Sequence, residues 1–350
     1  MTIFAICKLK VMNFKTFCIF VAAMVLLALH SCKKEEETKV YMDGTLKMEH
    51  SMPKYVKPGE KYTFTASGIT APDGTPVAYY FYSSASNNRS DTLRTPPYTY
   101  TYEIPDTLGA FSMNVVAYAV ESYNKYYVST ESVNFITVSD DPFDGSLTNI
   151  LPREDEMHEE LFDRNYALVY SGGKEWIRSN LSRIDRDAQG KEVFGMSYAQ
   201  SKAMQNIFGS YYTWEEAVNA CPPGWHLPSD AEWVDLLKDN GAPDSLQPFE
   251  TSPSGAGNLM VKGYFNGSEM WYYYRGVKIT DVSISAIPVG YATMEKGSWS
   301  FLGYQNYAVF WTADEFEGKG VYRYIYKEYD NVFVGSADKT GFAASVRCVR

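Results

Sequence analysis

One stretch of this chain, NACPPGWHLPSDAEW (residues 219–233), restricts the fold more than any other. It contains three prolines and a glycine, and a proline inside a helix removes a backbone hydrogen bond and clashes with the preceding turn. Helices on either side must therefore stop and restart here. Trp225 and Leu227 flank His226 between the prolines. We predict a rigid corner that places these two apolar side chains in a core.

Helix-start signals lie on both sides of this corner. Thr213 precedes Glu216 by three positions, and Ser229 precedes Glu232 by the same spacing, which is the pattern of a capping box. Gly241 then stands where a glycine commonly ends a helix. We predict one helix that begins after Thr213 and a second that runs from Ser229 to Gly241.

His226 is the residue of this corner that could carry chemistry. Asp230 is the nearest acid, but it lies in the first turn of the second predicted helix, where a carboxylate stabilises the helix dipole. The chain has four histidines and no histidine-rich cluster that would complete a zinc site. We predict a structural His226 that donates to a backbone carbonyl, and we expect no catalytic residue, metal or cofactor.

The N-terminus has the pattern of a secretory signal. Lysines precede the apolar run FCIFVAAMVLLAL, residues 17–29, and small residues follow it. The run is shorter than the roughly 20 residues of a membrane-spanning helix. Either Met1 or Met12 can be the start, since MNFK is the more usual opening.

The end of this signal, LHSC, resembles a bacterial lipobox, and that resemblance implies acylation of Cys32. The charged run KKEEE that follows resembles the signals that send Bacteroidetes lipoproteins to the outer leaflet. We expect a signal peptide over 1–31, an acylated tether over 32–42, and an anchor at the cell-surface side of the outer membrane. The alternative is an ordinary secretory signal with a chance cysteine.

Cysteine use agrees with export. Cys7 and Cys18 leave with the signal peptide, and Cys32 would carry lipid. Cys221 and Cys348 remain, an even pair in an oxidising compartment.

Residues 43–139 alternate apolar and polar positions in short runs separated by turn signals, without the period of a long helix. This pattern predicts an all-β sandwich. VKPGEKYTFTASG and PDTLGAFSMNVVAYAV resemble segments of immunoglobulin-like and PKD-type domains, which are usually spacers. The composition of SDDPFDGS predicts a linker, which we place at 140–152.

Composition restricts the partners. The formal net charge is −10, which argues against nucleic acid because phosphate binding needs a basic patch. The chain has 29 tyrosines, and such a composition is typical of β-rich exported proteins.

The region from 153 to 350 resembles the Fibrobacter succinogenes major paralogous domain. The motifs that carry the resemblance occur in the family's order: KEWIRSNL, GSYYTWEEAVNACPPGWHLPSDAEW, SISAIPVGY, AVFWTADE and GFAASVRCVR. The family has two adjacent tryptophans where this chain has Phe310 and Trp311. The family is itself similar to C-type-lectin-like and formylglycine-generating-enzyme-like folds. The resemblance implies an α+β domain with two helices and short aromatic strands.

The same resemblance implies a disulfide. In C-type-lectin-like domains a bridge joins the end of the first helix to the last strand, which are the places of Cys221 and Cys348. Formylglycine chemistry needs reactive cysteines, and this bridge would leave none. Calcium-dependent lectins carry sugar-binding triplets, and neither QPF at 247–249 nor WTAD at 311–314 matches them.

Binding through aromatic side chains is the function that these exclusions favour. EMWYYYRG places Trp271, Tyr272, Tyr273 and Tyr274 in a row, and Trp299 lies in a nearby loop region. We predict that they form a ligand surface, since exposed aromatic rings stack on sugars or anchor proteins. The alternative is a strand buried on one face. The expected function is non-catalytic recognition or adhesion, with a glycan or surface protein as ligand; an envelope enzyme acting on glycans and a structural surface component are the alternatives.

Overall fold

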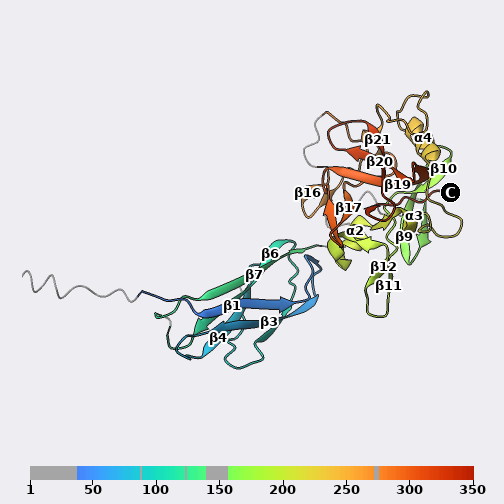
Figure 1. The fold of residues 1–350 in the computed structure, drawn as a ribbon. Helices are drawn as coiled ribbons and strands as arrows, with labels where there is room; N and C mark the ends of the chain where they lie inside the picture. Colours follow the sequence, from blue (N-terminus) through green and yellow to red (C-terminus); the bar gives the residue numbers. More distant parts are fainter. Residues whose placement is uncertain (1–37, 87–88, 123, 139–156, 272–275) are drawn as a thin grey trace, which may run out of the picture.

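A computed structural model describes residues 38–86, 89–122, 124–138, 157–271 and 276–350. The signal peptide, Cys32 and the predicted linker at 140–152 lie outside these residues. The described chain forms two lobes, one built from strands β1 to β7 and the other from the remaining elements (Figure 1).

The N-terminal lobe consists of two sheets. One has the order β1-β3-β5, with β1 at Asp43–His50, β3 at Lys61–Thr70 and β5 at Thr99–Glu103. The other has the order β2-β7-β6-β4, and its strands are Tyr55–Val56, Ser129–Thr137, Gly109–Ala119 and Val77–Ser83. All pairs are antiparallel except β2 with β7.

A single apolar core joins the two sheets. Phe64 from one sheet and Phe81, Met113 and Phe135 from the other are all at most 1% exposed and belong to one cluster. Phe64 and Phe81 approach within 6.4 Å between ring centroids. Two sheets around one core agree with the predicted N-terminal β-sandwich; its assignment to an immunoglobulin-like or PKD-type family stays a prediction.

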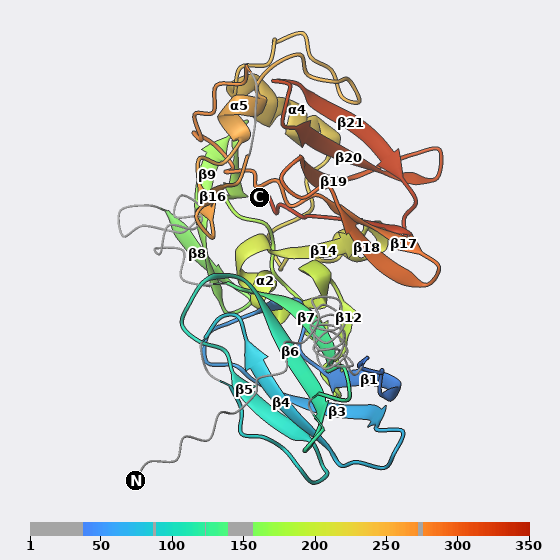
Figure 2. The same cartoon turned by 90° about the vertical axis from the view of Figure 1, so that its left-hand side faces the viewer.

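The two lobes share a packed junction. Tyr55 of β2 is buried in the core of the C-terminal lobe, and its ring lies 5.6 Å from that of Tyr198. Ser201 Oγ donates to the Tyr55 carbonyl, and Asn266 donates to the Thr137 carbonyl at 3.0 Å. Helix α2 (Lys202–Phe208) lies at this junction in both views (Figure 2). The sandwich therefore touches the second lobe directly.

The C-terminal lobe is organised around a five-stranded sheet of order β13-β14-β22-β17-β18. Strand β22 (Phe342–Ala344) lies in its middle, although it is the last strand of the chain. The other strands of this sheet are β13 (Met196–Ser197), β14 (Ser210–Thr213), β17 (Tyr291–Glu295) and β18 (Ser298–Leu302). The end of the chain is thus part of the core.

Smaller sheets surround this one. One of them is a meander of β8 (His158–Leu161), β9 (Arg164–Ser171) and β10 (Lys174–Ile177), with Gly172 and Gly173 at the turn between its last two strands. A second meander consists of β19 (Tyr307–Phe316), β20 (Lys319–Tyr326) and β21 (Val332–Ala337). Two short hairpins complete the strands: β11 (Asp185–Arg186) with β12 (Glu192–Phe194), and β15 (Tyr264–Phe265) with β16 (Ser268–Glu269).

Glycine is needed at the turn between β9 and β10. Gly172 has a φ of 60°, and a Cβ added there would lie 2.6 Å from the backbone nitrogen of Leu236. The hairpin can therefore pack against the helix that contains Leu236 only if this position lacks a side chain.

The helix starts were predicted correctly. Both α3 (Trp214–Ala217) and α4 (Asp230–Asp239) begin with complete capping boxes, from Thr213 and Ser229. The end of α4 is a Schellman motif, in which Ala242 donates to the Leu237 carbonyl and Gly241 to that of Lys238.

The predicted fold class of the C-terminal domain is wrong. We expected a C-type-lectin-like α+β domain with two helices, but strands make up most of this lobe. Its helices are short, and α2 and α5 (Ala256–Leu259) were not predicted. The helix α3 ends at Ala217, and Pro222 and Pro223 prevent a helix from continuing past Cys221. Alternating aromatic and apolar residues form strands over most of the remainder.

The disulfide between Cys221 and Cys348 is present and joins residues 127 positions apart. Around it, residues 345–350 bond to both sides of the lobe through their backbone. Cys348 accepts from Ile177 at 3.1 Å, and Val349 exchanges two hydrogen bonds with His226 at 2.9 and 3.0 Å. The end of the chain is held covalently and by a ladder of hydrogen bonds.

The double variant Cys221→Ala/Cys348→Ala tests how much the disulfide contributes to the free energy of unfolding. A loop of this length corresponds to roughly 4–5 kcal/mol in the chain-entropy model, so we expect a decrease of up to about 4 kcal/mol in the free energy of unfolding. Urea unfolding followed by tryptophan fluorescence measures it. Wild-type protein treated with dithiothreitol should unfold at the same midpoint as the variant; an unchanged variant midpoint contradicts the prediction.

Candidate functional site

The corner at residues 219–233 is a structural site. The His226 ring nitrogen lies 2.9 Å from Glu232 Oε1, whereas its backbone, not its ring, bonds to Val349. Our prediction of a ring bond to a backbone carbonyl is therefore wrong. Lys174 also reaches Glu232, at 3.2 Å. The Glu232 carboxylate thus accepts from the Ser229 N–H at the start of α4 and also contacts the His226 ring and the Lys174 ammonium group.

These contacts change the ionisation of Glu232. Burial raises its pKa, but hydrogen bonds from Ser229, His226 and Lys174 outweigh burial and leave the pKa below its ordinary value. Glu232 therefore stabilises the start of α4. In the described part of the chain, the His226 ring bonds to this carboxylate and to no serine, threonine or cysteine side chain.

Asp230 has a larger role than stabilising the helix dipole. Its side chain is fully buried and makes two 2.6 Å bonds to the guanidinium of Arg323, which is 1% exposed. The Arg323 Nη1 also donates to the Glu250 carbonyl at 2.7 Å, and the Phe249 N–H donates to Asp230 at 2.6 Å. The pair connects α4 to β20 across a core where neither charge could remain alone.

Arg347 is a second buried cation. It is fully buried next to Cys348 and donates to Asn180 Oδ1 at 2.9 Å and to the carbonyls of Arg178 and Ile284. Burial and, to a lesser extent, the nearby Arg178 lower its pKa to about 9, although Asp281 opposes the shift. Its bonds go chiefly to backbone oxygens, so Arg347 connects loops and is not available to a ligand.

An aromatic surface lies on one face of β19, β20 and β21, where several of its rings pack against an apolar core of the lobe. Tyr322, Tyr324 and Tyr326 alternate with the buried residues Val321, Arg323 and Ile325, as the period of a strand requires. We define the tyrosine face by its partly or largely exposed rings: Tyr291, Tyr307, Tyr322, Tyr324, Tyr326, Tyr329, Phe333 and Phe342.

Neighbouring rings hold one another in place. Tyr324 stacks on Phe333 and Tyr307 on Tyr326, each pair with centroids 4.9 Å apart, and Tyr322 stacks on Phe342 at 5.2 Å. A Cβ at Gly335 would meet the Tyr322 ring at 2.6 Å, so the glycine lets that ring lie against the sheet. The rings are therefore ordered before any ligand arrives.

A cleft of about 720 Å³ with charged side chains in its lining lies beside the β11–β12 hairpin. Trp299 lines it, and Trp299 and Phe301 alternate with Ser298 and Ser300 along β18. Arg186, Lys191 and Lys202 also line it. We call it the Trp299 cleft.

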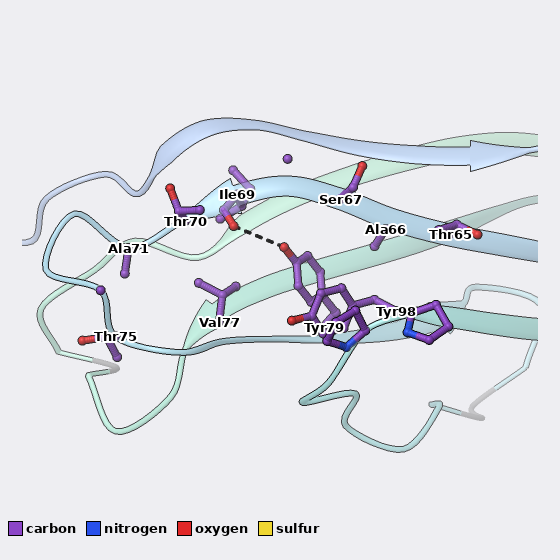
Figure 3. Close-up of a pocket in the computed structure, with 14 residues that line it drawn as sticks. Thr65, Ala66, Ser67, Ile69, Thr70, Ala71, Thr75, Val77, Tyr79 and Tyr98 are labelled. Atoms are coloured by element: carbon purple, nitrogen blue, oxygen red, sulfur yellow. Dashed lines mark hydrogen bonds between the residues drawn. The ribbon is translucent and has the colours of Figure 1, made fainter.

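The N-terminal lobe has a pocket of about 580 Å³ between β3 and β4. Tyr79 and Tyr98 lie against each other there with ring centroids 4.3 Å apart, and the Tyr79 hydroxyl donates to the Ile69 carbonyl (Figure 3). Its lining contains hydroxyl, aliphatic and proline side chains but no charged one. This pocket offers no group for acid–base chemistry.

The predicted ligand surface is only partly described. Trp271 is 1% exposed and donates to the Ala286 carbonyl at 3.0 Å, so its assignment to a surface is wrong. Its large apolar ring fits the core better than solvent. Tyr272, Tyr273 and Tyr274 lie outside the described residues. Trp299 is partly exposed, and it lines the cleft instead of joining Trp271.

Among the described residues, no group of three or more histidine, cysteine or acidic side chains could hold a metal ion. In that same part of the chain, no helix has the length and apolar character needed to cross a membrane.

The model of the Fibrobacter succinogenes major domain family matches residues 169–350. The chain belongs to this family. Its motifs surround the centre of the lobe: the Fibrobacter succinogenes major domain buries Trp311 from AVFWTADE and Arg347 from GFAASVRCVR. These motifs therefore mark the scaffold of the domain.

No curated protein matches the chain. Among solved structures, it is similar to the CARDB domain of a Pyrococcus furiosus protein, crystallised in complex with di-metal ions. The identity is 14%, the match covers 29% of this chain and 92% of that one, and the TM-score is 0.20. A TM-score of this size carries no argument about function or metal binding.

The sequence reasoning missed the tyrosine face of this Fibrobacter succinogenes major domain. Its signal was the alternation in VYRYIY, residues 321–326, which places three tyrosines on one side of a strand. We predicted the ligand surface at the continuous run EMWYYYRG instead. A dense aromatic run does not by itself distinguish a buried strand from an exposed one.

Asp230→Asn tests the buried ion pair. Removing one charge leaves the Arg323 guanidinium buried without its partner, so we expect a loss of about 3–5 kcal/mol in the free energy of unfolding. Asp235→Asn is the matched control, because Asp235 is exposed on the same helix, and we expect it to change stability by at most about 0.5 kcal/mol. Equal effects in chemical denaturation would contradict the assignment.

The lowered pKa of Glu232 predicts that the stability of the protein depends on pH. Its pKa is lower in the folded protein than the ordinary value of 4.5, so its contribution to stability is present above that pH and is lost as pH falls through the folded pKa. Thermal midpoints measured from about pH 6 to pH 3 should decline less steeply in Glu232→Gln than in wild type. Glu215→Gln, at an exposed position of α3, should keep the wild-type slope; the same slope in all three proteins would disprove the role.

Proposed function

We propose that this protein is a surface-displayed recognition protein, whose Fibrobacter succinogenes major domain binds a glycan or a surface protein without chemical turnover. The N-terminal sandwich is its spacer. The tyrosine face is the observation that carries this proposal.

The tyrosine face has the properties of a recognition surface. Tyrosine combines a large apolar ring with a hydroxyl, and it orders few rotatable bonds on binding, so it is enriched where ligands are recognised. Here, six tyrosines from β17, β19, β20 and the turn after β20 lie together on this face. Their mutual stacking lowers the entropy cost of ordering them for a ligand.

The carboxylates of the Trp299 cleft favour binding over hydrolysis. Glu216 accepts from the Thr213 and Gly195 N–H groups at 2.9 and 3.1 Å, and Glu192 accepts from Ser197 and Arg186. A glycosidase needs two carboxyl groups that face the scissile bond. Both carboxyl groups of this cleft are committed to the protein itself.

Display is the second part of the proposal. It rests on the lipobox-like LHSC and the charged run after it, which support acylation at Cys32 and an anchor in the outer membrane. The packed junction at Tyr55 supports a spacer that carries the binding domain as a unit, because Tyr55 belongs to the core of the C-terminal lobe.

Tyr324→Ala/Tyr326→Ala tests the recognition role. Truncating a ring at a binding hot spot costs more than about 1 kcal/mol, so removing two should weaken binding at least about tenfold. Binding is measured with purified protein on glycan arrays and on panels of envelope proteins.

Two matched controls show whether a loss of binding comes from removing the rings of the tyrosine face. Tyr324→Phe/Tyr326→Phe keeps both rings and removes the hydroxyls, and Tyr170→Ala removes a tyrosine that is 64% exposed on β9, outside the tyrosine face. Both should bind nearly as wild type does. The proposal fails if the folded alanine variant binds as tightly as wild type, or if wild type binds no member of either panel.

A further inference from the structure

The Trp299 cleft carries two cations that the protein does not neutralise. Arg186 is paired with Glu192 at 3.0 Å, but Lys191 and Lys202 are exposed and make no ion pair with any residue the structure describes. The lining thus has three cations against the two carboxylates of Glu192 and Glu216, a local charge of +1 (3 − 2). This excess stands out in a chain whose net charge is −10.

Both carboxylates are already engaged by hydrogen bonds, which leaves the lysines free for a ligand. Glu192 accepts from the Ser197 N–H and hydroxyl at 3.0 and 2.8 Å, and Glu216 accepts from the Thr213 hydroxyl at 3.0 Å. An incoming anion would therefore meet two ammonium groups at a site where Glu192 is ion-paired with Arg186 and the Glu216 carboxylate is held by neutral N–H and hydroxyl donors.

The cleft also presents groups that suit a sugar ring. Trp299 contributes a partly exposed indole, which can stack on the apolar face of a pyranose. Gln200 is exposed at the rim, and its amide can donate to and accept from hydroxyl groups. Stacking surface, amide and cations together match an acidic saccharide better than a neutral one.

The loop that carries Lys191 is ordered without a ligand. Asp187 Oδ1 accepts from the N–H groups of Gln189 and Lys191 at 3.0 and 2.8 Å, which closes the turn between β11 and β12. Lys202 begins α2, so its backbone is fixed as well. Fixed backbones reduce the ordering cost of binding at this cleft.

We propose that the Trp299 cleft binds a carboxylate-bearing sugar of the uronic acid class, with the ring on Trp299 and the carboxylate between Lys191 and Lys202. This site is separate from the tyrosine face. Tyr291 and Trp299 belong to paired strands, but Tyr291 packs with the core beneath the tyrosine face and Trp299 with the other core of the lobe.

The test is calorimetric titration of the full chain with a short oligogalacturonate and with its methyl ester, which keeps the sugar and removes the charge. We expect binding of the acid form, binding of the ester at least tenfold weaker, and a loss of affinity at higher salt. Lys191→Gln/Lys202→Gln should weaken binding of the acid at least tenfold, and Trp299→Ala should weaken binding of both forms.

Lys47→Gln/Lys319→Gln is the charge-matched control, because both lysines are exposed outside the cleft, and it should bind as wild type does. Tyr324→Ala/Tyr326→Ala should also bind the acid normally, so that a failure of the tyrosine face is distinguished from a failure of this cleft. The proposal is overturned if wild type binds no oligogalacturonate, if acid and ester bind equally, or if the control pair loses as much affinity as the cleft pair. Equal competition by polyglutamate of the same charge would show that the cleft recognises acidic peptides and that a sugar is the wrong assignment.

Discussion

The C-terminal lobe depends on the way its last six residues are held at its centre. Residues 345–350 exchange backbone hydrogen bonds with Glu175, Ile177 and Leu181 on one side and with His226 and the β19 strand on the other. The disulfide fixes the same segment covalently to the end of the α3 turn. Segments far apart in the sequence thus converge on the chain terminus, and the short helices and hairpins of the lobe acquire a common frame.

That frame explains why buried charges are tolerated. Arg347 and the Asp230–Arg323 pair lie inside the lobe, where an unpaired charge would be costly, but each group has carbonyl or carboxylate partners supplied by different segments. These partners come from loops that are far apart in the sequence, so they stay in place only if the fold holds those loops together. The polar interior therefore adds specificity to a lobe whose secondary structure elements are mostly short.

The same frame leaves two surfaces open. One is the tyrosine face, which packs against one apolar core of the lobe, and the other is the Trp299 cleft with its two exposed lysines, where Trp299 packs against the other core. The motifs that characterise the family contribute mainly to the centre, as the burial of Trp311 and Arg347 illustrates. Lys191 and Tyr324 lie outside these motifs, whereas Tyr291 and Phe342 of the tyrosine face lie within them.

Features that depend on neighbouring residues could be predicted from the sequence: the capping boxes at Thr213 and Ser229, the proline corner and the one pair of cysteines outside the signal and lipobox. These are local because a cap or a turn is made within a few positions. Three other features emerge only in the folded protein: Trp271 is buried, Asp230 pairs with Arg323, and strands outweigh helices in the C-terminal lobe. Burial and ion pairing depend on which distant segments meet, and a composition or a period does not contain that information.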